Sequence, residues 1–201
     1  MSLFSQLEEL QWKQLQHDEK YHKDIWLLSV QQRITHMTLH LAKYSAKLTV
    51  AAIDKDVDEF KKTVIDCLII IISSANIFNS RIYDIAISEQ EQKLETLTDL
   101  ANLLIDTEQV NAGESELLDF SKRITFNVGK MCKAVESLDH LEPFPFRQSI
   151  TECLGLCFRV SLASLYTLTD EKLETLFSNR LIPVERKNIF FNRLGNYESG
   201  Y

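Results

Sequence analysis

An acidic residue recurs at the same position in two similar stretches of this chain. The stretches read F-K-K-T-V-I-D-C-L from Phe60 and F-R-Q-S-I-T-E-C-L from Phe146, so Asp66 in the first corresponds to Glu152 in the second. A carboxylate in an apolar helix can cap the helix or pair with a lysine or arginine of its first turn. When it faces a pocket, it can instead bind a metal ion or transfer protons. The recurrence favours a pocket-facing role for both acids.

Four histidines precede Asp66 along the chain. His36 and His40 lie four residues apart, so on a helix they share a face and could form one edge of a metal site. No H-E-x-x-H pattern accompanies them and leucines flank them, so we interpret both as polar or partly buried helix positions. His17 and His22 lie in the polar stretch Q-H-D-E-K-Y-H-K-D, which we interpret as a solvated face or turn.

The end of the chain carries a local group of cations in a protein whose net charge is -7. In the stretch R-K-N-I-F-F-N-R, Lys187 and Arg193 could hold a phosphate group through charge-assisted hydrogen bonds. Asn188 and Asn192 lie four residues apart, so in a helix both amides would face one side and could contact a base or a sugar. The alternative is a polar, partly ordered terminus without a binding role.

The composition is that of an ordinary globular protein, with 45% hydrophobic and 25% charged residues among 201. The negative charge argues against nucleic acid as a partner, because phosphate backbones require a basic face. The most apolar run, 67–72, is too short to span a bilayer, so we expect no membrane segment. The start of the chain lacks a signal-peptide pattern. All four cysteines lie in apolar helical patterns, which favours reduced thiols and a cytoplasmic location.

Glycine and proline, which usually interrupt helices, are absent from the first 112 residues. Apolar residues recur there with spacings of three and four, which is typical of amphipathic helices. The sequence therefore predicts an all-α fold with helices over about 24–52, 57–78 and 88–105. The polar stretch 106–115, which holds the first glycine, is the candidate linker.

After this linker the helical pattern returns. The stretch I-T-F-N-V-G-K-M-C-K-A-V-E-S-L at 124–138 aligns with I-T-H-M-T-L-H-L-A-K-Y-S-A-K-L at 34–48, and the repeated acidic stretch follows each. We therefore predict one domain, 1–201, built from tandem-duplicated helical hairpins that form a four-helix bundle. The repeats would cover about 24–105 and 114–182, with further peripheral helices and a C-terminal tail at 183–201.

The first hairpin, L-H-L-A-K-Y-S-A-K-L-T-V-A-A-I-D-K-D-V-D-E-F-K-K-T-V-I-D-C-L-I-I-I-I-S-S-A-N-I-F, resembles the core of the all-α NTP pyrophosphohydrolases, the MazG and dimeric dUTPase superfamily. The hallmark of that superfamily is E-E-x-x-E on one helix and E-x-x-D on the next, whose carboxylates hold Mg²⁺ on a nucleoside triphosphate. The resemblance implies a four-helix bundle of that type, a nucleoside triphosphate ligand, Mg²⁺ if the protein is active, and a possible homodimer.

The acidic motifs depart from this pattern. The E-E-x-x-E positions fall on Lys43, Tyr44 and Lys47, and the E-x-x-D positions fall on Thr63 and Asp66. Only Asp66 keeps its carboxylate, and the two lysines bring positive charge to the expected metal position. They could replace part of the metal's charge toward phosphate, but they could not activate water as the metal does.

The second hairpin also keeps few acids. Its first helix offers Glu136, one place away from a motif position, and its second helix offers Glu152. The metal candidates implied by the resemblance are thus Asp66, Glu136 and Glu152. The C-terminal stretch V-E-R-K-N-I-F-F-N-R-L-G-N-Y-E-S-G-Y resembles the terminal segment that contacts nucleotide in several members. The nucleotide-binding candidates are Lys43, Lys47, Lys187, Asn188, Asn192, Arg193 and Tyr197.

Two functions remain open on these grounds. The first is a nucleotide-binding protein that resembles nucleoside triphosphate pyrophosphohydrolases, with weak or lost Mg²⁺-dependent activity. The alternative is a non-catalytic helical scaffold or regulatory subunit that acts through protein–protein contacts. Acidic side chains clustered around a pocket would favour an active enzyme.

Overall fold

The computed structural model of the chain describes residues 2–107 and 115–188. Within these ranges it contains nine α-helices, one short 3₁₀ helix and no strand, which confirms the all-α prediction. The helices are α1 (Leu3–Tyr21), α2 (Lys23–Trp26), α3 (Val30–Asp54), α4 (Val57–Ile77), α5 (Ile82–Ala86), α6 (Leu97–Thr107), α7 (Glu116–Asp139), α8 (Phe146–Tyr166) and α9 (Leu173–Glu185).

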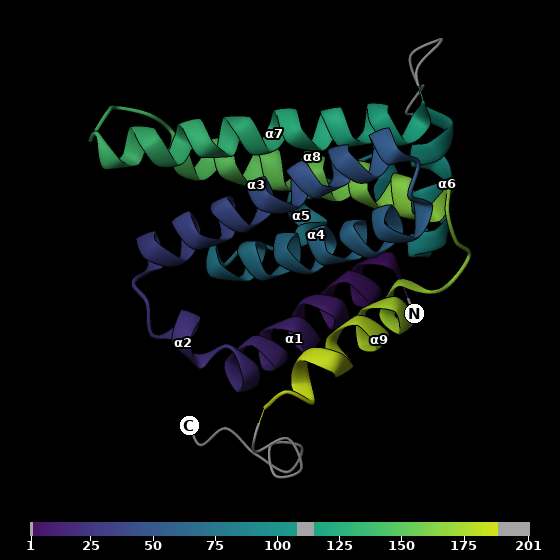
Figure 1. Cartoon of the computed structure of the whole chain (residues 1–201), viewed down its shortest axis with the longest axis horizontal. Helices are drawn as coiled ribbons and strands as arrows, with labels where there is room; N and C mark the ends of the chain where they lie inside the picture. The colour runs from purple at the N-terminus through teal and green to yellow at the C-terminus, as the bar shows by residue number, and fades with distance from the viewer. Residues whose placement is uncertain (1, 108–114, 189–201) are drawn as a thin grey trace.

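The four longest apolar helices pack together as two hairpins. The hairpin α3–α4 lies beside the hairpin α7–α8, with α3 against α7 and α4 against α8 (Figure 1). Each helix contributes side chains that are at most 1% exposed, such as Leu41, Leu68, Phe120 and Leu154. Burying such residues is the main favourable contribution to folding. This bundle is therefore the hydrophobic core against which the remaining helices pack.

Helix α4 begins and ends almost where the sequence predicts. The Asp56 side chain accepts a hydrogen bond from the backbone N–H of Glu59 at 3.0 Å and caps the helix. The prediction of one helix over 24–52 is wrong at its start, because the helix is interrupted between the end of α2 at Trp26 and the start of α3 at Val30. A capping box then begins α3: the Ser29 hydroxyl accepts from the Gln32 backbone N–H at 3.2 Å, and the Gln32 side chain accepts from the Ser29 N–H at 3.0 Å.

The helix predicted over 88–105 is wrong in its first half. That half contains a 3₁₀ turn, Glu91–Lys93, and regular helix begins only at Leu97. The Asp99 carboxylate accepts hydrogen bonds from both the backbone N–H and the hydroxyl of Thr96, at 2.9 and 2.7 Å. These bonds satisfy donors at the start of α6 and explain why the helix begins there.

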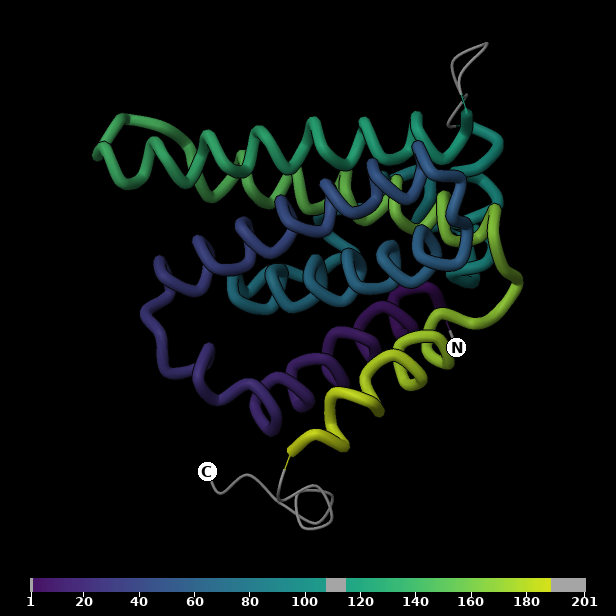
Figure 2. Tube along the Cα trace, in the orientation of Figure 1, coloured from purple at the N-terminus to yellow at the C-terminus, as the bar shows by residue number. Residues whose placement is uncertain are grey.

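A further layer, which the sequence reasoning did not identify, covers α4. Helix α1 packs against α4 and α5, and α9 packs against α4. The two helices lie side by side on the face of α4 away from the second hairpin, and α2 connects the end of α1 to the start of α3 (Figures 1 and 2). Leu3, Leu7 and Leu10 anchor α1 and are at most 3% exposed.

The structure bears on two expectations from the sequence, which concern a membrane segment and the state of the cysteines. No helix in the described part of the chain combines the length and the apolar character needed to cross a membrane. The four cysteines are free thiols: Cys67, Cys153 and Cys157 are buried and Cys132 is half-buried.

Candidate functional site

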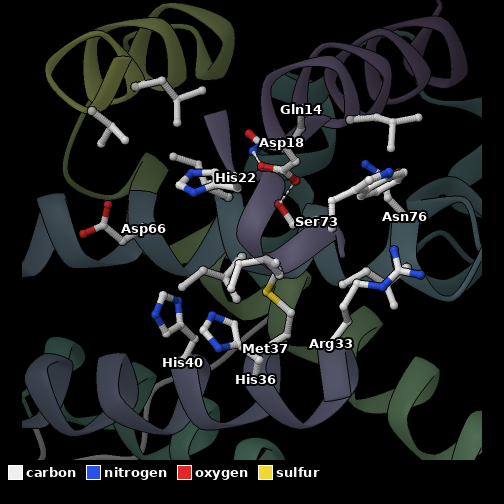
Figure 3. Close-up of a pocket in the computed structure, with 18 of the residues that line it drawn as sticks. Gln14, Asp18, His22, Arg33, His36, Met37, His40, Asp66, Ser73 and Asn76 are labelled. Atoms are coloured by element: carbon white, nitrogen blue, oxygen red, sulfur yellow. Dashed lines mark hydrogen bonds between the residues drawn. The ribbon is translucent and has the colours of Figure 1, made fainter. Parts of the chain in front are cut away.

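A cleft of about 210 Å³ opens between the bundle and the covering layer. Its walls come from α1, α2, α3, α4 and α9, so it exists only where α1 and α9 lie over the first hairpin. Figure 3 shows Asp18 and His22 on one side of it, with Arg33, His36 and His40 extending from α3 on the opposite side. Apolar side chains such as those of Trp26, Met37 and Ile70 line much of the remaining wall.

Asp66, the acid singled out by the repeat, faces this cleft from α4. Both of its carboxylate oxygens accept hydrogen bonds from Arg180 of α9, Oδ1 from Nε at 2.6 Å and Oδ2 from a terminal nitrogen at 2.7 Å. Such a two-bond contact is the strongest geometry that an arginine and a carboxylate can adopt. The hydrogen bond from Arg180 to Asp66 raises the pKa of the guanidinium. The positive charge next to Asp66 is therefore supplied by Arg180, at the position where the resemblance implies Mg²⁺.

A second acid, Asp18, enters the cleft from α1 and is also held firmly. Its Oδ2 accepts a hydrogen bond from the Ser73 hydroxyl at 2.6 Å, and its Oδ1 accepts one from the Gln14 amide at 2.8 Å (Figure 3). A carboxylate has about four acceptor positions, so each oxygen keeps capacity for another partner. Asp18 is thus fixed in orientation while it remains able to bind a cation or a donor.

The two histidines of α3 are neighbours on the opposite wall, with their rings tilted relative to each other. The rings of His36 and His40 lie 4.7 Å apart, and the ring of His40 also meets Tyr44 edge to face at 5.9 Å. Burial, followed by repulsion from Lys43 and from His36, lowers the pKa of His40 to about 4. At neutral pH His40 is therefore an uncharged imidazole that can accept or donate a hydrogen bond.

An arginine and two aromatic residues provide a different surface in the same cleft. The Arg33 guanidinium lies over the Trp26 ring at 5.0 Å from its centroid, and the buried Nε of Arg33 has no hydrogen-bond partner among the described residues. Tyr44 lines the cleft further along α3, and burial followed by the charge of Asp66 raises the pKa of its hydroxyl. Trp26 is 37% exposed.

His17, Asp18 and His22 form a compact group at the end of α1. Their potential metal-ligating atoms all lie within 4.8 Å of one another, and no other such group of three was found among residues 2–107 and 115–188. His17 is only 6% exposed, although the sequence suggested a solvated position. That expectation was wrong because His17 faces α9, where Glu185 lies 3.6 Å from its Nε2.

The three predicted metal candidates do not meet in this cleft. Glu136 is exposed on α7, where it pairs with Lys133 at 3.2 Å. Glu152 is exposed on α8, where it accepts a hydrogen bond from Gln148 at 2.8 Å. Neither lines the cleft that contains Asp66. The repeated acid therefore faces a pocket in the first hairpin and solvent in the second.

The nucleotide-binding candidates that the structure describes lie around the cleft rather than in it. Lys43 and Lys47 are exposed, and their ammonium groups lie 4.5 and 5.3 Å from the ring centroid of Tyr44, which does line the cleft. Lys187 is exposed and Asn188 half-buried, just beyond α9. Asn192, Arg193 and Tyr197 lie outside the described residues.

Several residues of the cleft were missed by the sequence reasoning. Asp18 and Gln14 belong to α1, where the helical spacing of Leu3, Leu7 and Leu10 is interrupted by buried polar residues. Arg180 lies 114 positions from Asp66, and no local pattern connects the two. The pairing of Arg180 with Asp66 could therefore not be predicted from this sequence alone.

Searches against protein-family models, curated proteins and solved structures found no match for this chain. The function must therefore be argued from the cleft itself. Its chemistry combines guanidinium groups, aromatic rings and neutral or titratable imidazoles around an apolar wall. That combination suits the binding of an anionic molecule with a ring, whereas its two acids are engaged with protein donors.

Proposed function

We propose that the cleft binds a nucleotide and that the protein does not cleave it through Mg²⁺ at Asp66. The observation that carries the proposal is the contact of Arg180 with both oxygens of Asp66, at 2.6 and 2.7 Å. Mg²⁺ in nucleotide hydrolases is bound through carboxylate oxygens in a near-octahedral arrangement. Because Arg180 already occupies both oxygens of Asp66, it opposes Mg²⁺ at the same position.

The opposite wall supports a nucleotide rather than a simple anion. Arg33 offers a guanidinium with an unpartnered Nε, suitable for phosphate, and Trp26 and Tyr44 offer rings against which a base can stack. The resemblance of the first hairpin to nucleotide pyrophosphohydrolases points to the same ligand class. Lys43 and Lys47, beside Tyr44, would extend the positive charge toward a longer phosphate chain.

The C-terminal tail is part of this proposal. Val184 lines the cleft, so the chain leaves α9 at its edge, and Lys187 and Asn188 follow within four positions. Asn192, Arg193 and Tyr197 come later in the sequence, outside the described residues, and their contact with a bound phosphate stays a prediction. Deleting 187–201 tests this part: weaker nucleotide binding with unchanged helicity supports it, and equal affinity removes the tail from the site.

A thermal-shift screen of nucleoside triphosphates tests the main proposal. We expect at least one to raise the melting temperature of the full-length protein without Mg²⁺, because a ligand that binds the native state stabilises it. The shift should disappear in Arg33→Gln and persist in Arg81→Gln, which removes an exposed arginine paired with Asp84. Pyrophosphate release with added Mg²⁺ should stay at background; robust release that Asp66→Asn abolishes would restore the enzyme interpretation.

One surface favours the second candidate, a scaffold that acts through protein contacts. Leu39, Val50 and Ile53 are 62%, 58% and 64% exposed, and helical spacing brings them to one side of α3 together with exposed Ala46. A second copy of the chain is the occupant that the resemblance to the dimeric dUTPase superfamily implies. Light scattering tests it: a dimer that Val50→Glu converts to a monomer supports the idea, and a monomeric wild-type protein contradicts it.

A further inference from the structure

The buried His17 is the least explained polar side chain of the cleft region. It is 6% exposed, and neither ring nitrogen has a hydrogen-bond partner among the described residues. Its Nδ1 lies 3.7 Å from Asp18 and its Nε2 lies 3.6 Å from Glu185, both beyond hydrogen-bond length. Buried polar groups are nearly always bonded, so an imidazole in this state points to a partner that lies between it and the carboxylates.

The neighbours of His17 are those that a transition-metal ion requires. Asp18 and His22 are four residues apart at the end of α1 and so share a face, and the ligating atoms of all three residues lie within 4.8 Å of one another. Ligands at about 2.0–2.2 Å from a tetrahedral Zn²⁺ stand roughly 3.3–3.5 Å apart. Small side-chain rotations would bring the ligating atoms from separations of up to 4.8 Å to the shorter separations around Zn²⁺.

The surroundings would support such ligands in the usual way. Ser73 and Gln14 hold the Asp18 carboxylate with bonds of 2.6 and 2.8 Å while leaving acceptor capacity on both oxygens. If His17 binds an ion through Nδ1, its Nε2–H points to Glu185, which is the carboxylate–histidine–metal arrangement common around metal sites. The C-terminal end of α1 also favours a cation through the helix dipole.

We infer that His17, Asp18 and His22 bind a divalent first-row transition-metal ion, of the Zn²⁺ or Fe²⁺ class. Two imidazoles and one carboxylate suit these ions, whereas Mg²⁺ prefers oxygen ligands alone. Because Asp18 and His22 also line the cleft, the remaining coordination positions would face the space where we propose that nucleotide binds. This site is separate from the Mg²⁺ position expected at Asp66 and does not depend on nucleotide binding.

Titration of Zn²⁺ into untagged full-length protein, by calorimetry and by competition with a chromophoric chelator, tests the inference. We expect one ion per chain, no competition from Mg²⁺, and Co²⁺ absorption bands typical of low coordination number. Binding should be lost in His22→Ala and Asp18→Asn. Glu185→Gln, which changes only the outer partner, should weaken it about 10- to 100-fold.

Two further variants make the outcome decisive. His140→Ala removes an exposed histidine away from the cleft and should leave Zn²⁺ binding unchanged. His36→Ala tests the competing pair on α3: loss of binding there, with retention in His22→Ala, would overturn the inference. Absence of saturable Zn²⁺ or Co²⁺ binding in the wild type would overturn it as well. Circular dichroism checks helicity, and if His22→Ala unfolds, the Glu185→Gln result decides.

Discussion

At the residue scale, the central contact of the cleft is the ion pair between Asp66 and Arg180. The recurrence of an acid in two similar stretches identified Asp66 as a pocket-facing candidate, and it does face the cleft. The partner, Arg180, could not be predicted, because the pairing depends on how α9 folds back over α4. The same limit applies to His17, whose burial results from its contact with α9 rather than from its polar sequence neighbours.

A double-mutant cycle on Asp66 and Arg180 measures how strongly the two are coupled. Their side chains are 13% and 30% exposed, so we expect Arg180→Met to lower the free energy of unfolding by about 1–3 kcal/mol, since it leaves a partly buried carboxylate without its donor. Adding Asp66→Asn should recover part of this loss. Urea denaturation of the four proteins checks it, and strictly additive effects would show that the pair does not interact in solution.

The depressed pKa of His40 makes stability depend on pH. Its pKa is about 4 in the folded protein against 6.5 for an ordinary histidine, because of burial and the nearby Lys43, His36 and His22, opposed by Asp66. Between these values the unfolded chain binds more protons, so stability should fall as the pH is lowered from about 6.5 toward 4. We expect His40 to contribute about 1 kcal/mol of this fall after allowing for its partial exposure.

Melting curves at pH 7 and pH 5 check this expectation. The decrease in melting temperature should be smaller in His40→Gln than in the wild type, whereas His140→Gln, at an exposed position, should behave as the wild type. An identical decrease in all three proteins would contradict the assignment of this effect to His40.

At the element scale, the long apolar helices were predictable and the short or covering ones were not. Helices α4, α7 and α8 follow the expected apolar runs, because a helix that is buried on several sides leaves a strong pattern. Helix α3 begins later than expected, since Ser29 and Gln32 form a capping box that periodicity alone does not show. Helix α1 was missed because its inward face carries polar residues such as Gln11 and Gln14 among its leucines.

Two helical glycines give a matched test of how closely these elements pack. A Cβ added to Gly155 of α8 would lie 2.0 Å from the backbone oxygen of Ile85, so Gly155→Ala requires α5 to move and should destabilise the protein by about 1–3 kcal/mol. A Cβ at Gly129 of α7 meets nothing within 4 Å, so Gly129→Ala should be neutral or stabilise by up to about 1 kcal/mol. Thermal or urea denaturation checks both, and equal effects would contradict the close approach of α8 and α5.

At the scale of the whole molecule, the two hairpins have similar cores but different surroundings. Equivalent core positions are buried alike, with Ile34 and Ile124 at 5% and 0% exposed and Leu68 and Leu154 both at 0%. Helices α1 and α9 cover the first hairpin, whereas α5 and α6 pack against α8 of the second. The duplication therefore remains a prediction that the burial pattern supports. The asymmetric cover explains why Asp66 lines a cleft whereas Glu152 is exposed on α8.

Superposing the hairpin α3–α4 on α7–α8 tests the duplication directly. We expect the paired helices to overlay in the same direction and with the same connection, related by a pseudo-two-fold axis. A superposition that matches the helices only in a different order or direction would contradict it.

Calorimetric titration measures in one experiment whether this cleft binds nucleotide without Mg²⁺-dependent cleavage. The nucleoside triphosphate selected by thermal shift is titrated into full-length protein, Arg33→Gln and Arg81→Gln, with and without Mg²⁺, and pyrophosphate is assayed in the same samples. We expect saturable binding without Mg²⁺ that is lost only in Arg33→Gln, with no pyrophosphate released. Binding that requires Mg²⁺, release of pyrophosphate that Asp66→Asn abolishes, or equal affinity in Arg33→Gln would contradict it.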